Sequence, residues 1–231
     1  MDLKFLSETP LFRGAAPQEV GEMLSCLGGE TRSYPKGAVI LQAGEVTRAM
    51  GLLLSGRAAV ESDDVWGNTS MLDHLGPGQV FGETYASLPE EPLMVSVVAS
   101  EPVTVLWLDV GRLLRVCPHQ CAHHHRLIAN LLAISAHKNL NLSRRIFHTT
   151  PKTIRGRLLS FLSFQAQRKG NPAFDLPLSR QQLADYLNVD RSALSNELSK
   201  MQRDGLLVVE KNHFVLHTSC LLYTSDAADE L

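Results

Sequence analysis

The most informative segment of the sequence is Leu178-Ser-Arg-Gln-Gln-Leu-Ala-Asp-Tyr-Leu-Asn-Val-Asp-Arg-Ser-Ala-Leu-Ser-Asn-Glu-Leu-Ser-Lys-Met201. Ser179 and Gln182 have the Ser-x-x-Gln form of a capping box, which predicts a helix of about ten residues that ends near Asn188. Asp190 predicts the N-cap of a second helix, and Gly205 its end. Two helices joined by a short turn form a helix-turn-helix.

The pattern of apolar residues in this stretch predicts which side of the second helix is exposed. One small core can be closed by Leu183, Ala184, Leu187, Val189, Leu194, Leu198 and Met201. The opposite face then presents Arg191, Ser192, Ser195 and Asn196, close to the helix N-terminus. That end of such a helix enters the major groove, where Arg contacts guanine and Asn contacts adenine. The alternative is an ordinary helical hairpin with a polar face.

Positive charge gathers around this motif, although the whole chain of 231 residues has a net charge of −2. Residues 152–211 carry 10 basic and 6 acidic side chains. We expect phosphate contacts from the basic residues Lys152, Arg155, Arg180, Lys200, Arg203 and Lys211. Residues 206–209 and 214–216 flank a polar turn and predict a β-hairpin, or wing, after the second helix. The expected partner is double-stranded DNA.

Two more helices are predicted upstream of the motif. Thr150-Pro151 predicts an N-cap followed by a first-turn proline, and Gly170 predicts the end of that helix. Residues 119–147 contain no Gly or Pro and predict a helix of roughly 42 Å. We expect this long helix to pair with a second copy, with His137 and Asn141 fixing the register. The alternative is that it lies across a sheet of its own chain.

The N-terminal half predicts β structure after one helix at 17–27. Short apolar runs alternate with glycines, at a spacing typical of a sandwich or jelly roll. We expect strands at 38–41, 51–54, 58–61, 70–72, 95–99 and 103–108.

Several separated motifs resemble the cyclic-AMP receptor protein / FNR (Crp/Fnr) family of bacterial transcription regulators, over about residues 5–217. Pro35-x-Gly37-x-x-Ile40-x-x-x-Gly44, Gly51-Leu-Leu-Leu-Ser-Gly56 and Gly76-Pro-Gly78-Gln-Val-Phe81-Gly82-Glu83 are similar to the turns of its cyclic-nucleotide-binding-type β-roll, and 178–201 to its winged helix-turn-helix. The resemblance implies an α+β fold with a β-roll sensor at 1–118, a long dimerisation helix at 119–148 and a winged helix-turn-helix at 149–217. It also implies a homodimer, allosteric control and RNA polymerase as a partner.

Within this resemblance, Arg191, Ser192 and Asn196 match the base-reading positions of the recognition helix. The family usually has arginine at the last of these positions. Asn196 therefore puts a preference for guanine at the corresponding base in doubt.

The resemblance also implies an effector pocket at Phe81, Gly82, Glu83, Leu93 and Met94. Members that bind cyclic AMP place a Gly-Glu pair on the ribose and an Arg-Ser pair on the phosphate. Gly82-Glu83 matches, but Leu93-Met94 replaces the second pair and removes a charge-assisted contact. Glu90 and Glu91 add negative charge nearby. We therefore do not expect cyclic AMP as the ligand; an apolar small molecule, or none, fits better.

Other members of the family sense redox state or gases through a metal cluster or haem. Only Cys26 lies near the N-terminus, which argues against a cysteine-ligated iron-sulfur cluster there. Cys117, Cys121 and His125 lie at the entrance to the long helix, and thiolate with imidazole suits zinc, iron or haem. A haem- or metal-dependent redox or gas sensor is the alternative function. The plainer alternative is a solvated, His-rich helix start without a cofactor.

The sequence argues against several other classes of protein. The motifs of serine hydrolases, P-loop NTPases and HExxH metalloproteases are not found, so we do not expect an enzyme. No apolar run approaches the length of a membrane span, and we expect a cytoplasmic protein. We expect residues 218–231 to form a flexible tail, with the alternative that they are foreign to the natural protein. The effector, the operator and the choice between activation and repression stay open.

Overall fold

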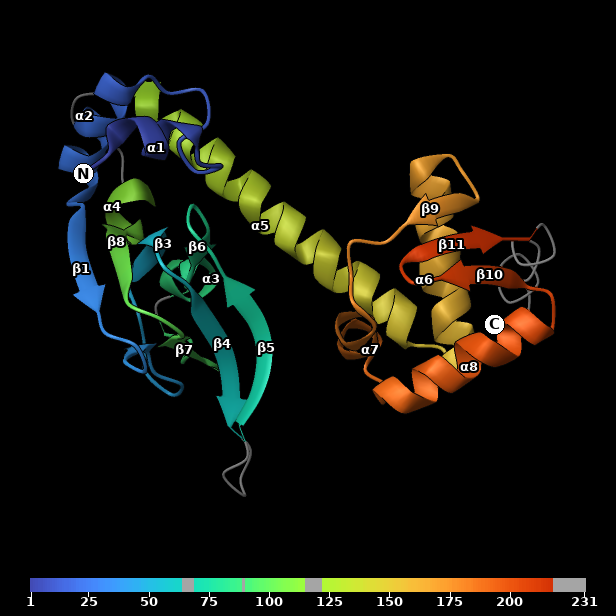
Figure 1. The fold of residues 1–231 in the computed structure, drawn as a ribbon. Coiled ribbons are helices and arrows are strands. Elements are labelled where there is room, and N and C mark those ends of the chain that lie inside the picture. The colour runs from blue at the N-terminus through green and yellow to red at the C-terminus, as the bar shows by residue number, and fades with distance from the viewer. Residues whose placement is uncertain (64–68, 89, 115–121, 218–231) are drawn as a thin grey trace. The chain divides into compact units, whose positions relative to one another are not determined.

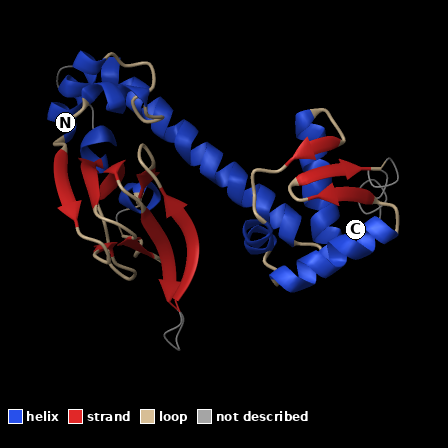
Figure 2. Ribbon diagram, viewed as in Figure 1, coloured by secondary structure: helices blue, strands red, loops and turns tan. Residues whose placement is uncertain are grey.

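The computed structural model describes residues 1–63, 69–88, 90–114 and 122–217. The chain divides into two compact units, a first unit of residues 1–137 and a second unit of residues 138–231. Helix α5, Ala122–Thr149, contributes residues to both units. Figures 1 and 2 show a first unit built mainly of strands and a second unit built mainly of helices. The predicted tail at 218–231 lies outside the described residues.

The described strands of the first unit form two antiparallel four-stranded sheets. One has the order β1 (Glu30–Tyr34), β8 (Val103–Asp109), β3 (Ala49–Ser55) and β6 (Val80–Phe81); the other has the order β2 (Val39–Leu41), β7 (Ser96–Ala99), β4 (Ala58–Asp63) and β5 (Thr69–Leu75). All six predicted strands are confirmed. Strand β1 was not predicted because Glu-Thr-Arg-Ser-Tyr is mostly exposed and has no apolar pattern.

Four short helices accompany the sheets, namely α1 (Leu3–Glu8), α2 (Pro17–Leu27), α3 (Glu83–Ser87) and α4 (Val110–Leu114). The helix predicted at 17–27 is confirmed, and Gly28 ends it in the left-handed conformation. Leu6, Leu11 and Phe12 share one buried core with Leu127 and Leu131 of α5. The N-terminal segment therefore packs on the beginning of the long helix.

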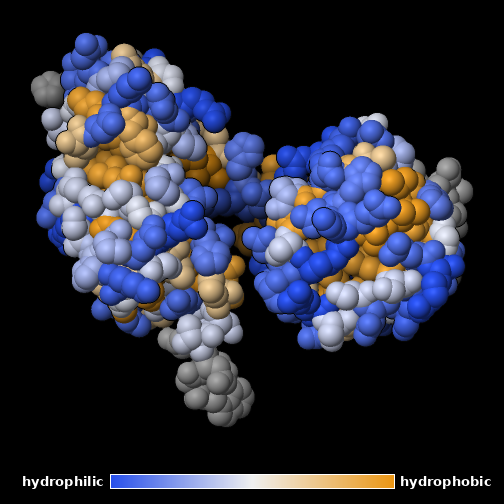
Figure 3. All heavy atoms as spheres, viewed as in Figure 1, coloured by the Kyte–Doolittle hydropathy of each residue, from blue (hydrophilic) through white to orange (hydrophobic). Residues whose placement is uncertain are grey.

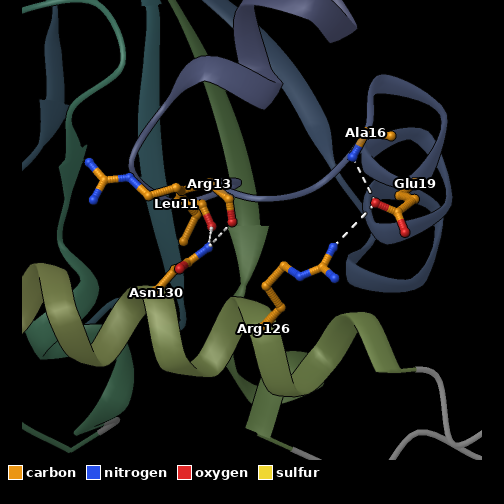
Figure 4. A network of polar contacts seen from close by, with 6 residues as sticks. All are labelled: Leu11, Arg13, Ala16, Glu19, Arg126 and Asn130. Atoms are coloured by element: carbon orange, nitrogen blue, oxygen red, sulfur yellow. Dashed lines mark hydrogen bonds and ion pairs between the residues drawn. The ribbon is translucent and has the colours of Figure 1, made fainter.

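Polar contacts reinforce this packing (Figure 4). The Asn130 side-chain amide donates to the carbonyls of Leu11 at 2.9 Å and Arg13 at 3.0 Å. The Arg126 guanidinium forms an ion pair with Glu19 at 3.2 Å, and the same carboxylate accepts from the backbone N–H of Ala16 at 2.7 Å. The side chains of Glu19 and Arg126 are more than a third exposed, so solvent weakens the ion pair.

The second core of the first unit lies between the two sheets. Phe81 meets Trp107 edge to face, with ring centroids 5.7 Å apart. The Phe81 ring also lies directly over Gly51 of β3, where an added Cβ would stand 2.2 Å from its Cζ atom. Gly51 is therefore required by the close approach of an aromatic ring to the strand.

The second unit contains α6 (Ile154–Lys169), β9 (Ala173–Asp175), α7 (Arg180–Leu187), α8 (Arg191–Arg203), β10 (Leu207–Glu210) and β11 (His213–Leu216). The Ser179–Gln182 capping box, the Asp190 N-cap and the predicted hairpin are confirmed. Strand β9 adds a third strand to the hairpin, in the order β10-β11-β9. It was not predicted because its three residues follow Asn171-Pro172 and carry too short a pattern.

The predicted start of α6 at Thr150-Pro151 is wrong. The N-cap is Thr153, whose hydroxyl accepts from the backbone N–H of Gly156 at 3.0 Å. The Thr150 hydroxyl instead donates to the Ile146 carbonyl at 2.8 Å, so it belongs to the end of α5. Both threonines are suitable capping residues, and only the backbone path decides between them.

The long helix predicted at 119–147 is confirmed over the described range Ala122–Thr149. Its exposed face carries the large apolar side chains Ile128, Leu132, Leu140, Leu142, Ile146 and Phe147, and His137 and Asn141 are exposed as well. Figure 3 shows that the visible surface of each unit is mainly hydrophilic and is interrupted by hydrophobic areas. Exposed apolar residues at helical spacing indicate a face suited to another helix.

His148, in the last turn of α5, is buried, with only 1% of its surface exposed. Its Nδ1 lies 3.0 Å from the Ser160 hydroxyl, and its Nε2 has no hydrogen-bond partner among the described residues. The rings of Phe161, Phe164 and Tyr186 lie around it, at centroid distances of 5.5, 5.2 and 6.2 Å. Burial, assisted by the nearby charge of Arg144, lowers the pKa of His148 below its ordinary value.

The second unit should therefore lose stability in mild acid. A lowered pKa means that the unfolded chain takes up the proton first, so stability is complete above about pH 6.5 and falls as the pH drops towards the folded-state pKa. We expect the thermal midpoint to fall between about pH 7.5 and pH 5, and to fall less in His148→Phe. If the thermal midpoint falls equally with pH in the wild-type protein and in His148→Phe, the role of His148 is contradicted.

Gly51→Ala should destabilise the first unit by about 1–3 kcal/mol, because the new methyl group would displace the Phe81 ring. Gly76→Ala is the matched control, since a Cβ there meets only a Gln79 side-chain oxygen at 3.7 Å. Urea unfolding followed by Trp fluorescence measures both. Similar midpoints for the two variants would show that the contact between Gly51 and Phe81 is unimportant.

Candidate nucleic-acid interface

The N-terminus of α8 is fixed by Asp190. Its carboxylate accepts from the backbone N–H of Ala193 at 2.9 Å and from the hydroxyl of Ser192. These hydrogen bonds, that from Ser192 first, lower the pKa of Asp190 below its ordinary value. Because the Ser192 proton is used within the protein, this hydroxyl faces the solvent mainly as an acceptor.

The two faces of α8 differ as the sequence predicts. Leu194, Leu198 and Met201 are buried in the core of the second unit. The side chains of Arg191 and Asn196 are exposed on the other side and make no hydrogen bond in the described part of the chain. Ser195 is half-buried, and its hydroxyl donates to the Arg191 carbonyl at 3.0 Å. Of the four predicted base-reading side chains, Arg191 and Asn196 keep their full hydrogen-bonding capacity.

The end of α7 receives hydrogen bonds from two arginines outside the helix-turn-helix. Arg157 of α6 donates through Nη1 to the carbonyls of Leu187 at 3.1 Å and Asn188 at 2.9 Å. Arg145 of α5 donates to the carbonyls of Tyr186 at 3.2 Å and Asp185 at 3.0 Å. Neither contact was predicted, because no local motif links residues 30 to 41 positions apart.

The predicted phosphate contacts fall into two groups. Lys152, Lys200, Arg203 and Lys211 are exposed, although Lys200 lies 3.9 Å from Glu197. Arg155 is instead held by Glu197 at 2.6 Å and Asp204 at 2.7 Å, and these two carboxylates raise its pKa above its ordinary value. Arg155 therefore connects α6 to α8, and its charge is already balanced.

Arg180 is half-buried at the start of α7, next to the wing. Its Nη2 donates to the carbonyl of Lys211 at 2.7 Å, and its guanidinium lies 5.1 Å from the centroid of the Phe214 ring. Burial lowers the pKa of Arg180 below its ordinary value. Lys211 stands at the tip of the wing with a left-handed backbone, at φ 52°. The structure thus brings Arg180 and Lys211 together at the wing turn.

The predicted effector-pocket residues lie around helix α3, but they face different surroundings. Phe81 and Leu93 are buried in the core between the sheets, Glu83 is 4% exposed, and Met94 is 75% exposed. Gly82 precedes α3 with φ 72°, a conformation that favours glycine. The Leu93 carbonyl accepts from the backbone N–H of Gly44 at 2.7 Å, and the Leu93 N–H donates to the carbonyl of Glu45 at 2.8 Å. Leu93 therefore fills the interior of the β-roll.

The first unit also contains a pocket of about 380 Å³ that was not predicted. Arg32, Tyr34, Trp107 and Arg112 are among the residues that line it, and none of the five predicted effector residues does. Arg32 forms an exposed ion pair with Glu30 at 2.9 Å, which lowers the pKa of that carboxyl. The Tyr34 hydroxyl accepts from the Trp107 indole N–H at 3.1 Å.

The structure describes one of the three candidate metal ligands. Cys117 and Cys121 lie outside the described residues, and His125 is exposed on α5. Within the described ranges, no three His, Cys, Asp or Glu side chains are grouped so that they could hold a metal ion. In the same ranges, no helix is both long and apolar enough to cross a membrane.

Comparisons with known proteins agree with this arrangement. The cyclic nucleotide-binding domain family matches residues 31–120, and the Crp-like helix-turn-helix domain family matches residues 156–219. The cyclic AMP receptor protein of Thermus thermophilus is 30% identical over 203 residues, which cover 86% of this chain and 88% of that protein. The transcriptional activator protein FnrL of Cereibacter sphaeroides is 32% identical over 88 residues, covering 34% of this chain and 36% of that protein.

A solved structure shows the same fold. The c-di-GMP responsive global regulator CLP of Xanthomonas campestris has a TM-score of 0.56 at 17% identity, covering 87% of this chain and 99% of that one. The β-roll, the helix-turn-helix with its wing, and a relative that matches across both units lead to one conclusion. This chain belongs to the Crp/Fnr family of DNA-binding transcription regulators.

Proposed function

We propose that this protein is a homodimeric, sequence-specific regulator that recognises DNA through Arg191 and Asn196 of α8 and responds to a signal other than cyclic AMP. The observation that carries the proposal is the exposed pair Arg191 and Asn196, on a helix whose opposite face is buried. Among the described residues, no hydrogen-bond partner occupies either of these two side chains. Arg191 offers a bidentate donor pair for guanine, and Asn196 offers a donor and an acceptor for adenine.

The remaining polar residues complete this interface. Ser192 and Ser195 lie beside the two base-reading residues, and Ser192 would accept a hydrogen bond from a base amino group. Lys200 and Lys211 would neutralise phosphates, with Arg180 supporting the wing that carries Lys211. The exposed apolar face of α5 supports pairing with a second copy. Two recognition helices would then meet half-sites about 34 Å apart, and RNA polymerase would be the partner at the promoter.

Leu93 is the residue that most disfavours binding of cyclic AMP. At this position the nucleotide-binding members of the family have an arginine, whereas the buried Leu93 offers no charge for a phosphate. Met94 is exposed, and Glu90 and Glu91 add negative charge to the same loop. An anionic ligand would lose its charge-assisted hydrogen bonds and meet repulsion. A small apolar effector, or none, is compatible with these side chains.

The experiment that tests the proposed function is selection of bound sequences from a random double-stranded DNA library, with the purified full-length protein. We expect enrichment of a palindrome with half-sites one helical turn apart. If no sequence is enriched, with or without cell extract as a source of effector, sequence-specific recognition by α8 is wrong.

Arg191→Ala should weaken binding to the selected operator by about 1–3 kcal/mol and relax the preference at one base pair per half-site. Lys211→Ala is the matched control, because the loss of a phosphate contact weakens binding to all sequences alike. Fluorescence anisotropy with the operator and its single-base variants separates the two patterns. Equal losses on every DNA for Arg191→Ala would contradict its role in base recognition.

Cyclic AMP at about 1 mM should leave the thermal midpoint unchanged, because a ligand stabilises only a protein that binds it. The cyclic AMP receptor protein of Thermus thermophilus, measured alongside, is the comparison. A rise of several degrees in this protein would show that Leu93 and Met94 do not prevent nucleotide binding.

A further inference from the structure

The last turn of α7 ends in backbone carbonyls that its own helix cannot satisfy. The Ala184 carbonyl accepts from the N–H of Val189 at 3.0 Å, after the chain turns at Asn188, whose φ is 52°. The Asp185 carbonyl accepts from the N–H of Asn188 at 3.3 Å and also from the Arg145 guanidinium. The carbonyls of Tyr186 and Leu187 receive guanidinium donors from Arg145 and Arg157 respectively. Two positive charges thus stand at the negative end of the α7 dipole.

The two arginines come from different elements and hold different carbonyls. Arg157 belongs to α6, within the body of the second unit, and it also donates to the Pro151 carbonyl at 2.9 Å. Arg145 belongs to the penultimate turn of α5, and its Nε and Nη2 bond two successive carbonyls of α7. Its guanidinium lies 5.9 Å from the centroid of the Tyr186 ring. Arg145 therefore joins the long helix directly to the last turn of α7.

We propose that Arg145 is a positioning residue for DNA recognition, which fixes the direction of α8 by capping the last turn of α7. Helix α8 begins at Arg191, four residues after α7 ends at Leu187. A change in the last turn of α7 is therefore passed to the recognition helix through a very short turn. The inference rests on the proposed role of α8 in reading bases, and it assigns the control of that role to a residue of the long helix.

The side chain of Arg145 is unsuited to a direct phosphate contact. It is half-buried, and two of its donor nitrogens are already used by carbonyls of α7. Its neighbour Arg144 is the natural comparison, because it has the same charge but donates to Asn141 of its own helix and lies over the Phe164 ring. Loss of either arginine removes one positive charge, whereas only the loss of Arg145 removes guanidinium donors from the Asp185 and Tyr186 carbonyls of α7.

The test compares Arg145→Ala, Arg145→Lys and Arg144→Ala in the full-length protein. Amide hydrogen exchange, measured without DNA, should speed up about tenfold at Asn188 and Val189 in Arg145→Ala, because the turn loses two charged hydrogen bonds. Arg144→Ala should leave these amides unchanged. Arg145→Lys, which keeps one donor group, should recover part of the protection.

Binding of the selected operator and of unrelated DNA supplies the second readout. In Arg145→Ala the ratio of specific to non-specific affinity should fall about tenfold, while the dependence of affinity on salt stays unchanged. A drop in the salt slope of about one would identify Arg145 as a phosphate contact and overturn the proposal. Equal exchange and equal binding in Arg145→Ala and Arg144→Ala would also overturn it. Hydrogen exchange is measured without DNA, so it tests the role of Arg145 in the turn even if α8 does not recognise bases. A failure of the proposed function can therefore be distinguished from a failure of this inference.

Discussion

The direction of the recognition helix depends on how the carbonyls at the end of α7 are satisfied. A helix C-terminus without donors leaves polar groups next to a hydrophobic core, which is costly. Here Arg145 and Arg157 supply those donors from α5 and α6, while Asn188 takes the left-handed conformation that lets α8 begin at once. The helix-turn-helix is therefore held from outside by charged side chains, and from inside by Leu187, Leu194 and Leu198.

Basic residues in the second unit fall into two groups, those that stabilise the fold and those that are free to contact DNA. Arg155 is neutralised by Glu197 and Asp204, Arg180 braces the wing, and Lys169 donates to the Asp175 carbonyl. These charges hold the fold, so the positive balance of residues 152–211 overstates the number of phosphate contacts. The surface that we propose for DNA is therefore narrower than the charge count indicates, and it consists mainly of the exposed side of α8.

Local signals made most of the fold predictable. Capping at Ser179 and Asp190, the glycine that ends α6, and the apolar spacing of α7 and α8 all act within a few residues, so the sequence displays them. Strand β1 was missed because its pairing with β8 is a long-range contact and its own side chains are mostly polar and exposed. Only part of the candidate site could be predicted. The exposure of Arg191 and Asn196 follows from the periodicity of the helix. The burial of Leu93 and the contacts of Arg145 and Arg155 depend on residues far apart in the sequence, so no local pattern indicates them.

The decisive measurement is a crystal structure of the dimer bound to its selected operator. We expect Arg191 and Asn196 to contact base edges in the major groove, with Arg145 still donating to the carbonyls at the end of α7. Finding Arg145 on a DNA phosphate, or α8 outside the major groove, would contradict this expectation.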